Sequence, residues 1–213
     1  MQTSVDTATV DSRWYPAQPP ESPSPSPWAK AKDSLDRRVR AMHALWLEAM
    51  HTMDALAVNT CERPGVLPIA FSLHHQVRLE DGCLFLLGAE PPLWGEWHER
   101  CRVAVDDIGK DTTVAQMERQ QIGNYDAFCA YAREVYARTE RWLGQLEPDR
   151  LGDVLFDGAY PQFIANAFIH RVVRDETVLL VDALECWVYQ HGLRHMGEVE
   201  HARALVGLGG LTS

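Results

Sequence analysis

Two histidines one helical turn apart are the residues of this sequence best suited to hold a metal ion. They are His191 and His195, within the stretch YQHGLRHMGEVE at 189–200. Residues at i and i+4 of an α-helix lie about 40° apart around the axis and about 6 Å apart along it. Their imidazoles can therefore converge on one ion at the roughly 2.0–2.1 Å typical of a zinc–nitrogen bond.

Both histidines lie on the apolar face of their predicted helix, in line with Leu184 and Val188 before them and Val199 after them. A polar group buried on such a face needs a partner. Hydrogen bonds to neighbouring core side chains are the alternative explanation for a buried histidine. A pair on the same inward face favours a metal.

A third ligand must come from another helix, and the adjacent residues His74 and His75 are the candidates. Helical periodicity places them on different faces of the segment 68–86, and both faces carry apolar residues. The periodicity therefore does not choose between them.

Two charged residues beside the pair are candidates for a supporting or catalytic role. Glu198 lies about one turn beyond His195 and is suited to orient a ligand from outside the coordination sphere. The alternative interpretation of Glu198 is a solvent-exposed helix residue without a role at the site. Arg194 is suited to bind an anionic group of a substrate, and its alternative is an ordinary surface position.

The remaining histidines and motifs carry weaker signals. His51 adjoins an apolar stripe and is expected in the core or beside a ligand. The histidines expected at the surface are His43, His98, His170 and His201. The sequence contains no phosphate-binding glycine-rich loop, no G-x-S-x-G and no H-E-x-x-H, which removes the usual rival chemistries.

Helical periodicity predicts the elements that position these residues. We expect long helices over 33–58, 68–86, from Thr112 or Thr113 to 148, and over 177–206, with shorter helices over 94–100 and 163–173. A turn is expected at Asp157, Gly158 and Pro161. No segment alternates like a strand and none repeats. The chain is therefore predicted to be all-α, a four-helix bundle whose second and third helices are joined by a long crossover over 89–111.

Composition limits the partners and the compartment. The chain has 213 residues and a formal net charge of -10. So acidic a surface argues against nucleic acid, because phosphate binding needs clustered Lys and Arg. No run of 18 apolar residues is present to span a membrane.

The first 30 residues and the five cysteines indicate where the folded domain begins and in which compartment the protein lies. Residues 1–30 are predicted to be a disordered or extended Pro/Ser-rich arm that lacks a secretory signal, followed by one domain over 31–213. The cysteines are odd in number and include no C-x-x-C pair, so we expect reduced, mostly buried thiols and a cytoplasmic protein.

Two stretches together resemble the DinB-like superfamily. The first is RPGVLPIAFSLHHQVRLED at 63–81, in which the acidic pair Glu80 and Asp81 identifies His75 as the ligand histidine of the motif. The second is HGLRHMGEVE at 191–200, followed by Arg203 and Gly207. The resemblance covers roughly residues 33–207. Pro68 stands where that family has a polar helix cap, and the link over 153–176 is longer than usual.

This resemblance implies an up-down-down-up bundle with one divalent metal ion, often zinc or nickel, on His75, His191 and His195. It also implies a small-molecule substrate and a thiol co-substrate such as mycothiol, bacillithiol or glutathione, in an S-transferase or isomerase. Homodimers are common in the family, although the sequence itself carries no sign of one. The alternatives are a metal-binding bundle without catalysis and a metal-dependent hydrolase or tailoring enzyme that uses no thiol.

Overall fold

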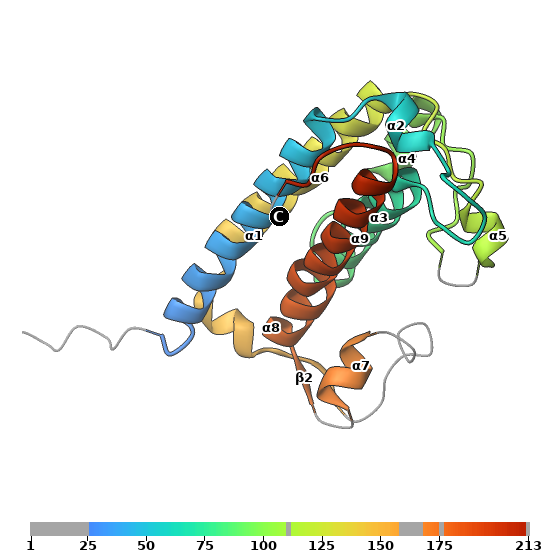
Figure 1. Cartoon of the computed structure of the whole chain (residues 1–213). Coiled ribbons are helices and arrows are strands. Elements are labelled where there is room, and N and C mark those ends of the chain that lie inside the picture. Colours follow the sequence, from blue (N-terminus) through green and yellow to red (C-terminus); the bar gives the residue numbers. More distant parts are fainter. Residues whose placement is uncertain (1–25, 110–111, 158–167, 175–176, 212–213) are drawn as a thin grey trace, which may run out of the picture.

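The chain is mostly helical, as predicted. The structure is a computed structural model that describes residues 26–109, 112–157, 168–174 and 177–211. Its longer helices are α1 (Ala29–His51), α3 (Ile69–Leu86), α6 (Tyr125–Gln145) and α9 (His191–Leu205), shown in Figure 1. The shorter ones are α2 (Ala55–Asn59), α4 (Trp94–Cys101), α5 (Val114–Met117), α7 (Phe168–Val173) and α8 (Leu180–Ala183).

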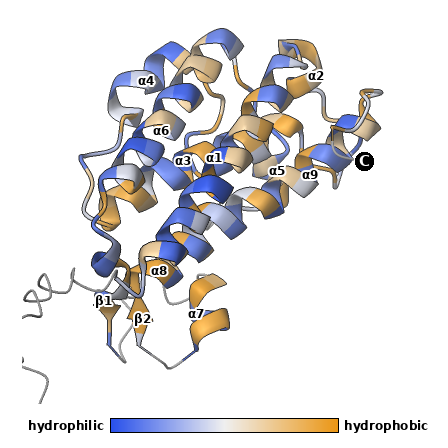
Figure 2. Ribbon diagram, turned by 90° about the vertical axis from the view of Figure 1, so that its left-hand side faces the viewer, coloured by the Kyte–Doolittle hydropathy of each residue, from blue (hydrophilic) through white to orange (hydrophobic). Residues whose placement is uncertain are grey.

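The long helices pack side by side around one apolar core. Helix α1 lies against α6, α3 lies against α9, and α3 also contacts α6 (Figure 1). Along these helices apolar and polar residues alternate, as expected for helices that bury one face (Figure 2). The largest fully buried side chains are Trp46, Tyr131, Tyr136, Phe128, Leu35 and Met42.

The predictions for α3 and α4 are confirmed, and one buried carboxylate joins the two helices. Asp81 accepts hydrogen bonds from the backbone N–H groups of Leu93 (3.1 Å) and Trp94 (3.0 Å) at the start of α4. It also accepts one from the Tyr131 hydroxyl at 2.9 Å and pairs with Arg138 at 3.2 Å. Asp81 thereby anchors the link between α3 and α6 to the core.

The first predicted helix, 33–58, is interrupted in the structure. α1 ends at His51, and α2 begins after Asp54, whose side chain accepts a hydrogen bond from the Ala57 N–H at 2.8 Å. An aspartate that caps a new helix start competes with continuation of the old helix. His51 is consequently exposed, and its predicted place in the core or beside a ligand is wrong.

The prediction of one helix from Thr112 or Thr113 to 148 is also wrong. Thr113 does precede a helix, but this is the single turn α5, and the long helix α6 begins only after Asn124, which caps it through the Ala127 N–H at 3.1 Å. Between them an isolated bridge pairs Val103 with Ile122. The side chain of Gln120, which lies in this break, bonds to backbone rather than to solvent.

The last segment differs most from the prediction of one helix over 177–206 and no strands. After a 3-10 turn (Pro148–Gly152), strand β1 (Val154–Phe156) pairs antiparallel with β2 (Val178–Leu179). Then come α8, a π-helix (Leu184–Gln190) and α9, which ends before Gly207 at φ +84°, the predicted C-cap. α7 accounts for part of the short helix expected over 163–173. Residues 163–167, and Gly158 and Pro161 of the expected turn, lie outside the described residues.

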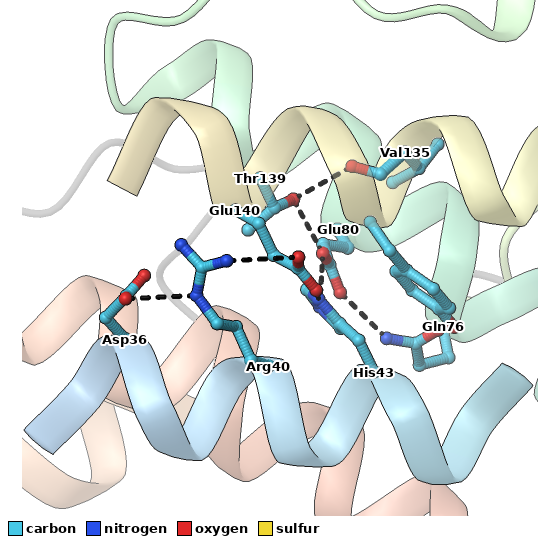
Figure 3. Close-up of polar contacts among 9 residues, drawn as sticks. Asp36, Arg40, His43, Gln76, Glu80, Val135, Thr139 and Glu140 are labelled. Carbon is cyan, nitrogen blue, oxygen red and sulfur yellow. Dashed lines mark hydrogen bonds and ion pairs between the residues drawn. The ribbon is translucent and has the colours of Figure 1, made fainter. Parts of the chain in front are cut away.

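His43 is buried in a polar network rather than exposed, so its predicted surface position is wrong. Its Nδ1 lies 2.9 Å from Glu140 Oε1, and its Nε2 lies 3.0 Å from Glu80 Oε1 in an ion pair without hydrogen-bond geometry (Figure 3). Glu80, which has no exposed surface, also accepts from Thr139 at 2.7 Å and from Gln76 at 3.0 Å. The network connects α1, α3 and α6.

Three further expectations concern the chain as a whole. All five cysteines are free thiols, as predicted, although Cys61 is exposed. Within the described part of the chain, no helix has both the length and the apolar character needed to cross a membrane. The predicted arm lies almost entirely outside the described residues, and α1 begins one residue after Trp28.

Candidate metal centre

The structure brings the rings of His75, His191 and His195 together. Each offers one nitrogen, and these three nitrogens lie within 4.8 Å of one another. The ring centroids are 4.4 Å apart for His191 and His195, 4.5 Å for His75 and His195, and 5.1 Å for His75 and His191. α3 supplies the first ring and the start of α9 the other two, so the group depends on the packing of α3 against α9.

His75 is oriented by the loop that precedes α5. Its Nδ1 donates to the backbone carbonyl of Ile108, which leaves Nε2 as the nitrogen that faces the centre. The loop can approach this closely because residue 109 is glycine. A Cβ at Gly109 would lie 2.6 Å from Cζ of Phe71, whose ring stacks on His75 at 5.7 Å, and its φ of +92° also favours glycine.

His195 is oriented by Glu198. Its Nδ1 donates to Glu198 Oε2 at 2.6 Å, and the same oxygen accepts from Ser72 Oγ of α3 at 3.2 Å. In the neutral tautomer that donates from Nδ1, Nε2 of His195 is the nitrogen left for a metal ion. The expectation that Glu198 orients a ligand matches this contact, and Ser72 is a supporting residue that helical periodicity did not identify.

One nitrogen that faces the centre lacks a protein partner, and two others approach each other. His195 Nε2 is buried without a hydrogen-bond partner among the described residues. His75 Nε2 lies 3.2 Å from His191 Nε2, where two lone pairs repel each other unless one nitrogen carries a proton. A cation at this point satisfies several of these nitrogens at once, so the residues fit a divalent metal ion.

The electrostatics of the site favour the neutral imidazoles of His75 and His191, and the neutral form is the one that binds metal. Burial and the neighbouring His195 and His75 lower the pKa of His191 to about 2. Burial and His195 also lower the pKa of His75. Burial is the largest single effect on Glu198 and would raise its pKa, but the contacts with His195, Ser72 and His75 together outweigh burial and lower the pKa, so Glu198 remains a carboxylate.

His74, the alternative third ligand, turns away from the site. It has no exposed surface, and its Nδ1 lies 2.9 Å from the side-chain amide nitrogen of Gln120. Burial lowers its pKa to about 3. The structure thus places His75 at the site and His74 in the core, a choice that helical periodicity left open.

Arg194 is exposed and lies between His191 and His195 in the sequence of α9. Its guanidinium lies 4.7 Å above the ring of Phe168 in α7. Its charge contributes to the low pKa of His75 and of His191, which places it within electrostatic reach of both rings. It touches neither of these rings, so a catalytic role for Arg194 stays a prediction.

The other histidines do not join the group. His98 and His201 are exposed, as predicted, and His170 is half-buried. A cavity of about 700 Å³ lies elsewhere, between the end of α1 and the start of α6, and is lined by residues such as Met50 and Tyr125.

Fold and site together define a mostly helical protein with a three-histidine group that could hold a metal ion. The chain is similar in structure to a crystal structure described as the conserved protein of locus from Enterococcus faecalis. The TM-score is 0.65 at 19% identity, over 82% of this chain and 96% of that one. At that identity the likeness shows the fold alone. No protein-family model matches the chain, and no curated protein matches its sequence.

Proposed function

We propose that this protein binds one divalent metal ion, zinc or nickel, on His75, His191 and His195. The observation that carries the proposal is the convergence of three imidazole nitrogens within 4.8 Å, of which His195 Nε2 is buried without a partner. Leaving such groups unpaired in a core costs free energy. Protein side chains of the described residues do not offset that cost, whereas a cation would.

The reaction we propose is a thiol-dependent transfer or isomerisation of a small electrophile, which makes the protein an S-transferase-like enzyme. A divalent ion on three neutral imidazoles retains an open position at which the pKa of a thiol or a water falls. The chain supplies the orientation: Ile108 and Glu198 hold His75 and His195 through their Nδ1 atoms. The choice of thiol chemistry comes from the DinB-like motifs of the sequence.

The wider assignments belong to the same proposal. We infer an up-down-down-up four-helix bundle over residues 31–213 that follows the arm over 1–30, in a cytoplasmic protein that binds neither nucleic acid nor membrane. A low-molecular-weight thiol and a small molecule are the proposed ligands, and a homodimer is the proposed assembly. The packing of α1 on α6 and of α3 on α9 supports the bundle.

A second candidate is a metal-binding bundle without catalysis. The observation that favours it is the burial of two ligand rings, because His191 is 7% exposed and His195 is 6% exposed. A closed site of this kind stabilises a fold more readily than it admits a substrate. A hydrolase or tailoring enzyme without thiol dependence is the remaining alternative.

The first experiment is elemental analysis of purified protein beside two variants from α9. We expect about one equivalent of metal in the wild type and in His201→Ala, whose residue is exposed, and a large loss in His195→Ala. Equal metal content in all three proteins would remove His195 as a ligand. Wild-type protein that takes up no zinc or nickel would contradict the proposal itself.

The second experiment separates the reactions. Metal-loaded protein is incubated with mycothiol, bacillithiol or glutathione and a panel of electrophiles, and thiol consumption is followed. Turnover that requires both metal and thiol supports the transferase. Turnover of esters or amides without thiol would favour hydrolysis, and bound metal without turnover would favour the non-catalytic bundle.

A further inference from the structure

The π-helix ends at the residue before His191. The buried residues before and after it show how it changes the direction in which the helix buries its side chains. Before and within it the main buried positions are Leu180, Ala183, Leu184, Trp187 and Val188, and after it they are His191, Gly192, His195, Met196, Val199 and Arg203. In an uninterrupted α-helix, the mean directions of these two sets would differ by about 100°, the rotation of one residue. A π-turn holds one residue more than an α-turn, so it brings both sets to the same side.

The π-turn needs support from outside the helix, because π geometry is rare and the α-helix is the default. Arg38 of α1 supplies it. Its Nη1 donates to Glu185 Oε2 at 3.3 Å, and its Nη2 pairs with Glu185 Oε1. The same guanidinium lies 4.5 Å above the ring of Tyr189. One side chain thus contacts both ends of a five-residue span within the π-helix.

A second contact from α1 lies one turn further on. Met42, four residues after Arg38, packs on Gly192, and a Cβ at position 192 would overlap the Met42 sulfur. The two contacts fix both the π-turn and the first turn of α9 against the same helix. His191 lies between them, so its ring direction depends on α1, although α1 itself contributes no ligand.

We propose that Arg38 is a positioning residue of the metal centre, which holds the π-turn formed and thereby aims His191 at the nitrogens of His75 and His195. The inference rests on the proposed metal binding. Loss of the π-turn would rotate one of the two buried sets by about 100°. Metal–ligand distances tolerate only about 0.2 Å, so even a partial rotation weakens the site.

The test compares Arg38→Gln and Glu185→Gln with Arg37→Gln, a matched control. Arg37 is exposed, and its Nε donates to the backbone carbonyl of Asp33 in its own helix at 3.3 Å. Affinity for Zn²⁺ is measured by competition with a chelating dye, and coordination geometry by the visible absorption of the Co²⁺-loaded protein. We expect Zn²⁺ affinity to fall about 10- to 100-fold in both variants, the usual effect of lost support around a ligand, with an altered Co²⁺ spectrum.

Two further variants separate positioning from general destabilisation. Arg38→Gln with Glu185→Gln should bind Zn²⁺ no worse than Arg38→Gln alone, because Glu185 supports the π-turn through its contact with Arg38. The charge swap Arg38→Glu with Glu185→Arg should bind more tightly than Arg38→Glu alone. Should Arg38→Gln not fold, Tyr189→Leu takes its place with the same expected changes.

Wild-type affinity and an unchanged Co²⁺ spectrum in Arg38→Gln would overturn the inference while leaving the proposed metal binding intact. Additive losses in the double variant would also overturn it. A wild-type protein that binds neither Zn²⁺ nor Co²⁺ would instead contradict the proposed function, and this inference with it.

Discussion

His195 and Glu198, one turn apart on α9, form a hydrogen bond of 2.6 Å that aims the imidazole. The carboxylate accepts from Nδ1, so the opposite nitrogen, Nε2, is left to face the other two rings. The two residues have different roles on the same helix. His195 is suited to bind a metal ion, and Glu198 holds the His195 imidazole in the tautomer that such binding requires.

Removing that carboxylate should weaken metal binding. We expect Glu198→Ala to lower Zn²⁺ affinity about 10- to 100-fold, and Glu198→Gln to lower it less, because the amide oxygen still accepts from Nδ1. Isothermal titration calorimetry measures the affinities. Glu134→Ala, at an exposed position of α6, is the control. An unchanged affinity in Glu198→Ala would mean that His195 needs no orienting partner.

Gly192→Ala should destabilise the protein. The new methyl group would overlap the Met42 sulfur, and Met42 can yield only within a packed core, so we expect a loss of about 1–3 kcal/mol in the free energy of unfolding. Gly197→Ala, on the same helix with nothing near its Cβ, should be stabilising by up to about 1 kcal/mol. Urea denaturation of the two metal-free variants measures this difference. Equal effects of the two substitutions would contradict the expected clash with Met42.

The network around His43 should make stability depend on pH. Burial lowers the pKa of His43, but Glu80 and Glu140 outweigh it and raise the pKa from 6.5 to about 9. A group whose pKa is raised on folding stabilises fully below its unfolded pKa and loses that contribution as pH rises through the folded value. We expect the free energy of unfolding to decline by about 3 kcal/mol between pH 6.5 and 9.

Urea denaturation across that pH range measures the decline. The slope should largely disappear in His43→Gln and persist in His201→Gln, which alters an exposed histidine. Half-buried thiols such as Cys83, whose pKa desolvation raises to about 12, add to the decline in the free energy of unfolding only above this window. A flat profile in the wild type would show that His43 is neutral in the folded protein.

Asp81→Asn should be the most damaging of these changes to the fold. The carboxylate accepts from two backbone N–H groups and one hydroxyl, and it pairs with Arg138, which is itself buried. An amide at position 81 leaves Arg138 without its counter-charge. It also directs an NH₂ group at the N–H and O–H donors that the carboxylate had satisfied. We expect a loss on the order of 3 kcal/mol in the free energy of unfolding.

Thermal and urea denaturation of Asp81→Asn beside Asp126→Asn tests this expectation. Asp126 is exposed on α6, so its substitution should change stability little. Comparable stability of the two variants would mean that the Asp81–Arg138 pair is replaced by other contacts at little cost.

Features set by near neighbours along the chain were predictable. The i, i+4 spacing of His191 and His195 requires only a helix, and α3, α4 and the glycine end of α9 follow from local signals. The interruptions were not predictable, because each results from competition between similar local structures. Asp54 and Asn124 start new helices where the periodic pattern alone continues the old one.

The sequence by itself therefore determined a mostly helical chain with two histidines on one face of its last helix. Helical periodicity left open which of His74 and His75 joins them, and the resemblance to the DinB-like motif pointed to His75. The tertiary structure brings His75 to the group, through Gln120 on His74 and the Ile108 carbonyl on His75. Helical periodicity predicts which face of the helix carries a side chain. The direction of an imidazole is set by the hydrogen-bond partner that meets it, and these partners come from segments more than thirty residues away.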